Sequence, residues 1–115
     1  MQSLALLRAN TLQYVRLTKI LCLYAEDKYT LSRVECEPKP FFISTNPSLL
    51  QLEPTVVNAG FMRVNRDCLA NRHYFDRLVR REALKYQLVL RDGFKISVSR
   101  RHIKALKALF KGNAG

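Results

Sequence analysis

The sequence lacks long apolar runs and has few glycines and prolines, and each shortage excludes a class of protein. Its longest apolar run, Ile20–Ala25, is far shorter than the roughly 20 residues that cross a bilayer. The N-terminal MQSLALLR has no basic residue ahead of its four apolar ones, unlike a signal peptide. With 4 Gly, 4 Pro and 48% hydrophobic residues, the chain can form a packed core. We therefore expect one domain over residues 1–115, in the cytoplasm and without a membrane partner.

Residues that carry enzyme chemistry are also scarce. Cys22, Cys36 and Cys68 form no CxxC pair, and with His73 and His102 they match no metal-ligand spacing. Cys68 and His73 could act as nucleophile and base, but no third group is indicated. No GxxxxGK[ST] or GxGxxG loop is present to hold a nucleotide. We expect no enzyme, metal or cofactor, and we interpret the cysteines as small apolar side chains in a reducing compartment.

Negative charge is in short supply, and the shortage is concentrated in one half of the chain. The sequence has 20 Lys and Arg against 9 Asp and Glu, a net charge of +11. Residues 1–60 carry 6 basic and 5 acidic side chains, whereas residues 61–115 carry 14 basic and 4 acidic ones. Such asymmetry is typical of chains that bind nucleic acid or anionic membranes, although some basic excess is only solvated surface. A polyanion is the expected partner.

Short alternating segments separated by polar turns predict a mostly β fold. Two hairpins are expected near the N-terminus, 4–8 with 11–17 and 20–24 with 29–35, and a third is expected around Asp92-Gly93, the strongest turn signal in the chain. Further strands are expected over 62–65, 68–70 and 75–81. Because Pro38 and Pro40 precede it, Phe41–Ser44 is predicted to be an edge-like strand.

Two helices are predicted, a short one near 47–57 and a longer one near 100–110. For the first, Asn46-Pro47 is the expected start, Leu49, Leu50 and Val56 or Val57 form the apolar side, Pro54 kinks or divides it, and Gly60 closes the segment. For the second, Ser99 is the expected N-cap and Ile103, Leu106 and Phe110 form the packed face. Its cations form one stripe at helical spacing, Arg100, Lys104, Lys107 and Lys111. They either form a solvated face or meet phosphates; their mutual repulsion favours phosphates.

Three motifs, in order along the chain, carry a resemblance to a known family. Residues 20–30 read ILCLYAEDKYT, residues 61–67 read FMRVNRD, and residues 98–102 read VSRRH after a Tyr-containing strand and Asp-Gly. Together with their spacing, they resemble the LytTR family of bacterial DNA-binding domains. The VSRRH variant is similar to that of alginate-regulator-like response-regulator output domains. The resemblance runs from about Leu4 to Phe110.

The resemblance implies an elongated fold of about ten short strands in small sheets, with DNA-contacting residues on loops. It places these contacts at Lys28, Tyr29 and Thr30, at Asn65 and Arg66, and at Arg100 and Arg101; the helical stripe adds Lys104 and Lys107. Arg66 and Arg100 have the fork that reads guanine, and Thr30 could contact a thymine methyl or a phosphate. Many relatives have His where this chain has Asn65. Because an amide side chain prefers adenine, this departure leaves the DNA sequence that the chain recognises undetermined.

Other basic residues have alternative interpretations. Arg63 either contacts DNA or pairs with Asp67 or Asp76, Arg72 and His73 could merely close a turn, and Arg80 and Arg81 are expected to face solvent. Tyr29 and Tyr86 could stack or donate to phosphate, although strand aromatics are more often core.

The function predicted from the sequence is a sequence-specific, duplex-DNA-binding transcription regulator. It is either the output domain of a two-component response regulator or a stand-alone regulator. The resemblance implies a receiver domain and a sensor kinase as further partners, and no receiver domain lies in these residues. We expect a weak homodimer on repeated promoter sites. The alternative is an RNA-binding or ribosome-associated basic module, although the RNP-type aromatic run and GXXG loop are missing.

Overall fold

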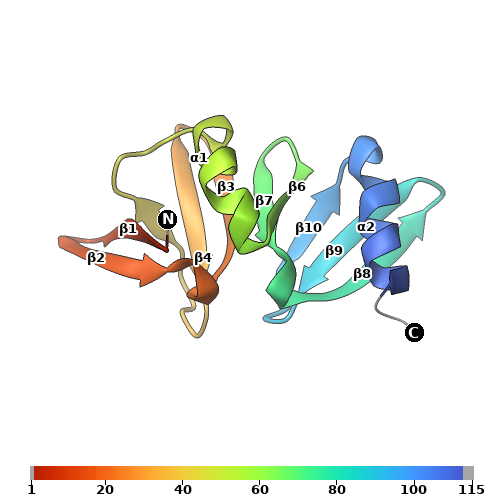
Figure 1. The fold of residues 1–115 in the computed structure, drawn as a ribbon, viewed down its shortest axis with the longest axis horizontal. Coiled ribbons are helices and arrows are strands. Elements are labelled where there is room, and N and C mark those ends of the chain that lie inside the picture. The colour runs from red at the N-terminus through yellow and green to blue at the C-terminus, as the bar shows by residue number, and fades with distance from the viewer. Residues whose placement is uncertain (1, 113–115) are drawn as a thin grey trace.

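The computed structural model describes residues 2–112, which form ten strands and two α-helices in an elongated molecule of 44 × 30 × 27 Å (Figure 1). A seven-stranded sheet contains β1 (Ser3–Arg8), β2 (Thr11–Arg16), β3 (Ile20–Glu26), β4 (Tyr29–Val34), β5 (Phe41–Ile43), β6 (Phe61–Asn65) and β7 (Cys68–Asn71). A three-stranded sheet contains β8 (Phe75–Glu82), β9 (Lys85–Leu90) and β10 (Lys95–Val98). The helices are α1 (Leu49–Val56) and α2 (Arg100–Gly112). The predicted fold class is confirmed.

Neighbouring strands in both sheets pair antiparallel, in the orders β2-β1-β5-β4-β3-β7-β6 and β10-β9-β8. The three predicted hairpins are all present, and Gly93 turns the chain between β9 and β10 with a φ of 90°. The edge-like strand predicted over Phe41–Ser44 is wrong, because β5 lies inside the sheet between β1 and β4. Both prolines precede the strand, so the amides of Phe41 and Phe42 remain free to pair.

Strand β3 explains why the sequence has a continuous apolar run there, because it is buried on both faces. On one face, Ile20 and Leu23 belong to a core that α1 covers, with Val56 and Phe61. On the other face, Cys22 joins a second core between the seven-stranded sheet, the three-stranded sheet and α2. A strand covered on both sides needs apolar side chains at successive positions rather than at alternate ones.

The cysteines are all free, and Cys22 and Cys68 are buried while Cys36 is exposed. A hydrogen bond with the Cys68 thiol and burial raise the pKa of Cys22 well above its usual value. A thiol in this state stays protonated and is a poor nucleophile or metal ligand. The interpretation of the two buried cysteines as small core side chains therefore agrees with their environment.

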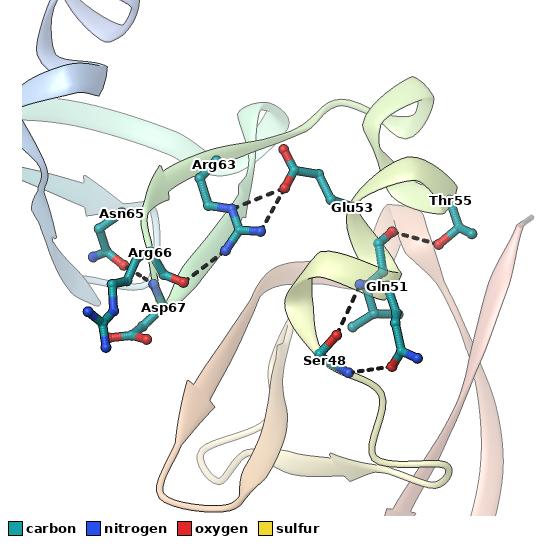
Figure 2. Close-up of polar contacts among 9 residues, drawn as sticks. Ser48, Gln51, Glu53, Thr55, Arg63, Asn65, Arg66 and Asp67 are labelled. Carbon is teal, nitrogen blue, oxygen red and sulfur yellow. Dashed lines mark hydrogen bonds and ion pairs between the residues drawn. The ribbon is translucent and has the colours of Figure 1, made fainter.

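Helix α1 begins two residues later than Asn46-Pro47 predicts. Ser48 is the N-cap, and its hydroxyl accepts from the Gln51 amide while the Gln51 side chain accepts from the Ser48 amide, a capping box (Figure 2). Leu52 replaces Leu50 on the buried side, with Leu49 and Val56. The helix continues through Pro54 to Val56, and after a 3₁₀ turn over Val57–Ala59, Gly60 ends the segment with a φ of 99°.

Helix α2 confirms the predicted C-terminal helix and its packed face. Leu106 is fully buried, and Ile103 and Phe110 are half-buried against the second core. The Phe110 ring stacks on Phe75, with ring centroids 6.2 Å apart. The hydroxyl of Ser99, just before the helix, donates to the Val64 carbonyl at 3.4 Å. This contact joins the start of α2 to β6.

Candidate nucleic-acid interface

The three segments that the sequence singled out lie along one edge of the molecule, which we call the loop edge (Figure 1). It carries the β3–β4 turn at 27–28, the β6–β7 turn at 66–67 and the start of α2 at 100–101. Tyr24 pairs with Cys68 and the Ala25 amide donates to the Asp67 carbonyl at 2.9 Å, so the end of β3 lies beside the β6–β7 turn. The antiparallel topology therefore brings segments 33 to 74 residues apart in sequence to one surface.

The first loop of this edge, Lys28–Thr30, is held by Asn46. The Asn46 side chain donates to the Lys28 carbonyl and accepts from the Thr30 amide, both at 2.9 Å. Thr30 is only 5% exposed and its hydroxyl donates to the Pro47 carbonyl, so it fixes the loop from inside. Lys28 and Tyr29 are exposed, and the Tyr29 ring meets Phe42 edge to face at 5.2 Å. Lys28 and Tyr29 are thus the side chains that this loop presents to a ligand.

In the second loop, the Asn65 side chain shapes the turn around Arg66. Its oxygen accepts from the Asp67 amide and its nitrogen donates to the Ser97 carbonyl, both at 2.7 Å. Arg63 donates to the Arg66 carbonyl at 2.8 Å (Figure 2). These bonds occupy the oxygen and one N–H of the Asn65 side-chain amide, which the sequence suggested for adenine recognition. They leave the exposed Arg66 guanidinium pointing away from the turn.

Arg63 has a structural partner, but not the one that the sequence suggested. Its guanidinium donates twice to one carboxylate oxygen of Glu53 in α1, at 2.7 and 3.1 Å, rather than to Asp67 or Asp76. The side chain of Arg63 is only 18% exposed, so solvent screens this pair less than an open surface pair. Arg63 therefore couples α1 to the loop that presents Arg66 (Figure 2).

The third segment begins α2 and presents Arg100 and Arg101, both exposed. The Ser99 amide donates to the Val64 carbonyl at 3.1 Å, so this segment is attached to the strand that leads into the Arg66 loop. Next to them, His102 is half-buried; burial, followed by the charges of Arg101 and Arg63, lowers its pKa. His102 therefore stays neutral to a lower pH than a free imidazole and adds little charge to the loop edge.

The lysines of the α2 stripe line a groove that runs away from the loop edge. The groove, of about 900 Å³, lies between α2 and the three-stranded sheet and has Leu78, Tyr86 and Ile103 among its walls. Lys104 and Lys107 line it, and the Lys107 ammonium lies 4.9 Å from the centre of the Tyr86 ring. At 1.5 Å per residue, Lys107 is about 10 Å farther along the helix axis than Arg100.

Most acidic side chains are already paired with cations elsewhere. Six of them form ion pairs, Glu35, Glu37, Glu53, Asp76, Glu82 and Asp92. Within residues 2–112, the predicted contact residues Lys28, Arg66, Arg100, Arg101, Lys104 and Lys107 form no ion pair. Their positive charge is therefore available to an external anion.

Sequence reasoning missed three residues that build this edge, Asn46, Leu50 and Glu53. Asn-Pro is itself a turn signal, so Asn46 could have been identified as a loop residue rather than as a helix cap. Nothing local marks Glu53 as the partner of Arg63. Together with Lys28, Tyr29 and Arg66, Leu50 lines a hollow of about 390 Å³ between the first two loops.

No helix within residues 2–112 is long and apolar enough to cross a membrane. In the same range, no cluster of three or more His, Cys, Asp or Glu residues could hold a metal ion.

Comparison with known proteins identifies related chains and a related fold. The chain is 34% identical over 67 residues to the sensory transduction protein LytT of Bacillus anthracis, and 33% identical over 67 residues to LytT of Bacillus cereus. Each match covers 58% of this chain but 27% of the relative, so the chain matches about a quarter of these longer proteins.

A solved structure shares the fold over almost its whole length. It is the LytTr DNA-binding domain of a methyl-accepting/DNA response regulator from Bacillus cereus, with a TM-score of 0.82, 19% identity, and coverage of 96% of this chain and 97% of that one. The family model described as the LytTr DNA-binding domain matches residues 10–111. The chain therefore belongs to the LytTR family of DNA-binding domains.

Proposed function

We propose that residues 1–115 work as one DNA-binding domain of a sequence-specific transcription regulator. The observation that carries this proposal is the loop edge, where three segments distant in sequence present unpaired cations on one side of a rigid sheet. Phosphate contacts fix register, and arginine forks read base edges. In this proposal Arg66 and Arg100 read bases, and Lys28, Tyr29, Arg101, Lys104 and Lys107 contact the backbone. Thr30 and Asn65 position the loops.

The remaining partners follow from the same proposal. The domain acts in the cytoplasm by binding rather than by catalysis, on repeated promoter sites where two copies associate weakly. Its output is controlled either through a receiver domain and sensor kinase, as in a two-component system, or by the chain alone. The LytT relatives are described as sensory transduction proteins, which supports a signalling role.

Competition at fixed salt tests the proposal. A labelled duplex recovered by selection from random DNA is bound, and unlabelled duplex DNA, single-stranded DNA and RNA hairpins compete for the chain. We expect duplex DNA to compete best, and the plot of log affinity against log salt to have a slope of about −3.6, because four cations meet phosphates and each contributes about −0.9. A slope near zero would contradict the phosphate contacts on which this proposal depends. Equal competition by RNA hairpins would favour the alternative of an RNA-binding module.

A further inference from the structure

Leu50 is a large apolar side chain turned toward solvent at the loop edge. Helix α1 buries Leu49, Leu52 and Val56, which are spaced three and four residues apart on one face. Leu50 falls outside this face and is 77% exposed. Single exposed leucines are common, so the exposure alone carries no function. Its position relative to the loops of the edge is the informative observation.

Leu50 lies in the hollow between the two loops that present Lys28 and Arg66. The same hollow is lined by Tyr29, which is 53% exposed, and by Asp27. The surroundings of Leu50 are held firmly. The capping box of Ser48 and Gln51 fixes the first turn of α1, and the Glu53–Arg63 pair joins α1 to the Arg66 loop (Figure 2). A ligand that meets Lys28 and Arg66 together lies over the hollow that Leu50 also lines.

The chemistry of a DNA groove determines what an isobutyl group can contact there. Phosphate and sugar oxygens need donors or cations, which Leu50 lacks. Among the base edges of the major groove, the one apolar group is the C5-methyl of thymine. Arg66, the neighbouring candidate reader, has the geometry for guanine. An apolar side chain beside it would therefore read a different base.

We propose that Leu50 contacts a thymine methyl group and makes the chain prefer an A·T pair close to the guanine that Arg66 reads. This inference rests on the proposed DNA-binding function and assigns one base preference to one side chain. It adds a reader from α1 to an edge whose other candidate readers lie on turns and at the start of α2.

Replacement of each thymine of the selected duplex by deoxyuridine, one at a time, tests the contact. This change removes one methyl group and keeps the pairing. For the wild-type chain, we expect an affinity loss of about fourfold at one position, the worth of one buried methyl group. For Leu50→Ala, the same replacement should have no effect at that position, and Leu50→Met should restore part of it. Val57→Ala is the matched control, because Val57 is 50% exposed at the other end of α1 and outside the hollow.

The outcomes separate this inference from the function on which it rests. A wild-type chain that selects no duplex sequence overturns the proposed function itself. A chain that selects a sequence, while Leu50→Ala keeps the wild-type sensitivity to deoxyuridine at every position, overturns the role of Leu50 alone. Equal weakening of thymine and deoxyuridine duplexes by Leu50→Ala also overturns it, because the side chain would then act without reading the methyl group.

Discussion

Two arginines only three positions apart have different environments, and the difference comes from a helix that neither belongs to. The Arg63 guanidinium is occupied by Glu53 and by the Arg66 carbonyl, whereas Arg66 is exposed. The motif FMRVNRD identifies both residues as candidates. The motif cannot show which of the two is available to a ligand, because the Glu53 carboxylate that binds Arg63 lies in α1, ten residues earlier. Candidate sites are therefore predictable from sequence by segment, and their individual roles need the packing.

At the residue scale, base readers and backbone contacts should respond differently to truncation. Arg66→Ala and Arg100→Ala should each lose about 1–3 kcal/mol of binding free energy on the specific duplex and little on random DNA. Lys107→Ala should weaken both duplexes equally, since phosphates carry no sequence information. Fluorescence anisotropy with both duplexes measures these losses. Identical losses on specific and random DNA for all three variants would show that Arg66 and Arg100 contact only the backbone.

The His102 imidazole should make stability depend on pH. Burial, with the nearby charges of Arg101 and Arg63, lowers its pKa in the folded chain below the ordinary value of about 6.5. The unfolded chain then binds more protons in this range, so the free energy of unfolding falls as the pH drops below about 6.5 and levels off below the folded pKa.

Urea unfolding of the wild type and His102→Gln between pH 5 and 8 measures this dependence. The variant should lose the part of the pH dependence that the imidazole causes. Curves for the two chains that stay parallel over the whole range would assign the pH dependence to other groups.

At the scale of elements, the start of α1 shows where local signals conflict. Asn46-Pro47 and Ser48 are both good helix starts, and propensity alone cannot choose between them. The structure uses Asn46 instead to hold the Lys28–Thr30 turn, 16 to 18 residues earlier in the chain. Local signals also could not place β5 in the sheet, because its position between β1 and β4 depends on pairing with strands distant in sequence. Hairpins and α2, which depend on local pattern, were predictable.

Asn46 should therefore matter more to the loop than to the helix. Asn46→Ala removes two side-chain hydrogen bonds. It also places an alanine at a φ of 45°, where its Cβ is strained and no side-chain hydrogen bond compensates. We expect a loss of about 2 kcal/mol in the free energy of unfolding. Asn46→Gly should regain the part of the free energy of unfolding that is lost to backbone strain, because glycine tolerates positive φ. It should not regain the part that comes from the two hydrogen bonds. Chemical denaturation of the three chains measures both parts; equal stability of Asn46→Ala and the wild type would contradict this role.

At the scale of the whole molecule, the length of the loop edge limits what one copy can read. The edge runs along the longest dimension of the molecule, 44 Å, and one turn of B-DNA is about 34 Å. Because the three loops occupy only part of this length, one copy covers at most slightly more than a helical turn. With each base pair contributing about 1–3 kcal/mol, so short a site does not specify a unique genomic address. In the proposed function, a second copy on a neighbouring site would supply the missing specificity.

The spacing between two such sites should control cooperativity through the helical phase of the duplex. Two copies that touch on one face of the DNA lose contact when about five base pairs are inserted between their sites, because half a turn moves one copy to the opposite face. An insertion of about ten base pairs returns both copies to one face and should largely restore cooperativity. Titration of duplexes with each spacing, together with sedimentation of the free chain, measures both parts of this model. Cooperativity that ignores the half-turn, or a stable dimer without DNA, would contradict weak association on the duplex, since a strong dimer contact would not depend on the DNA to align it.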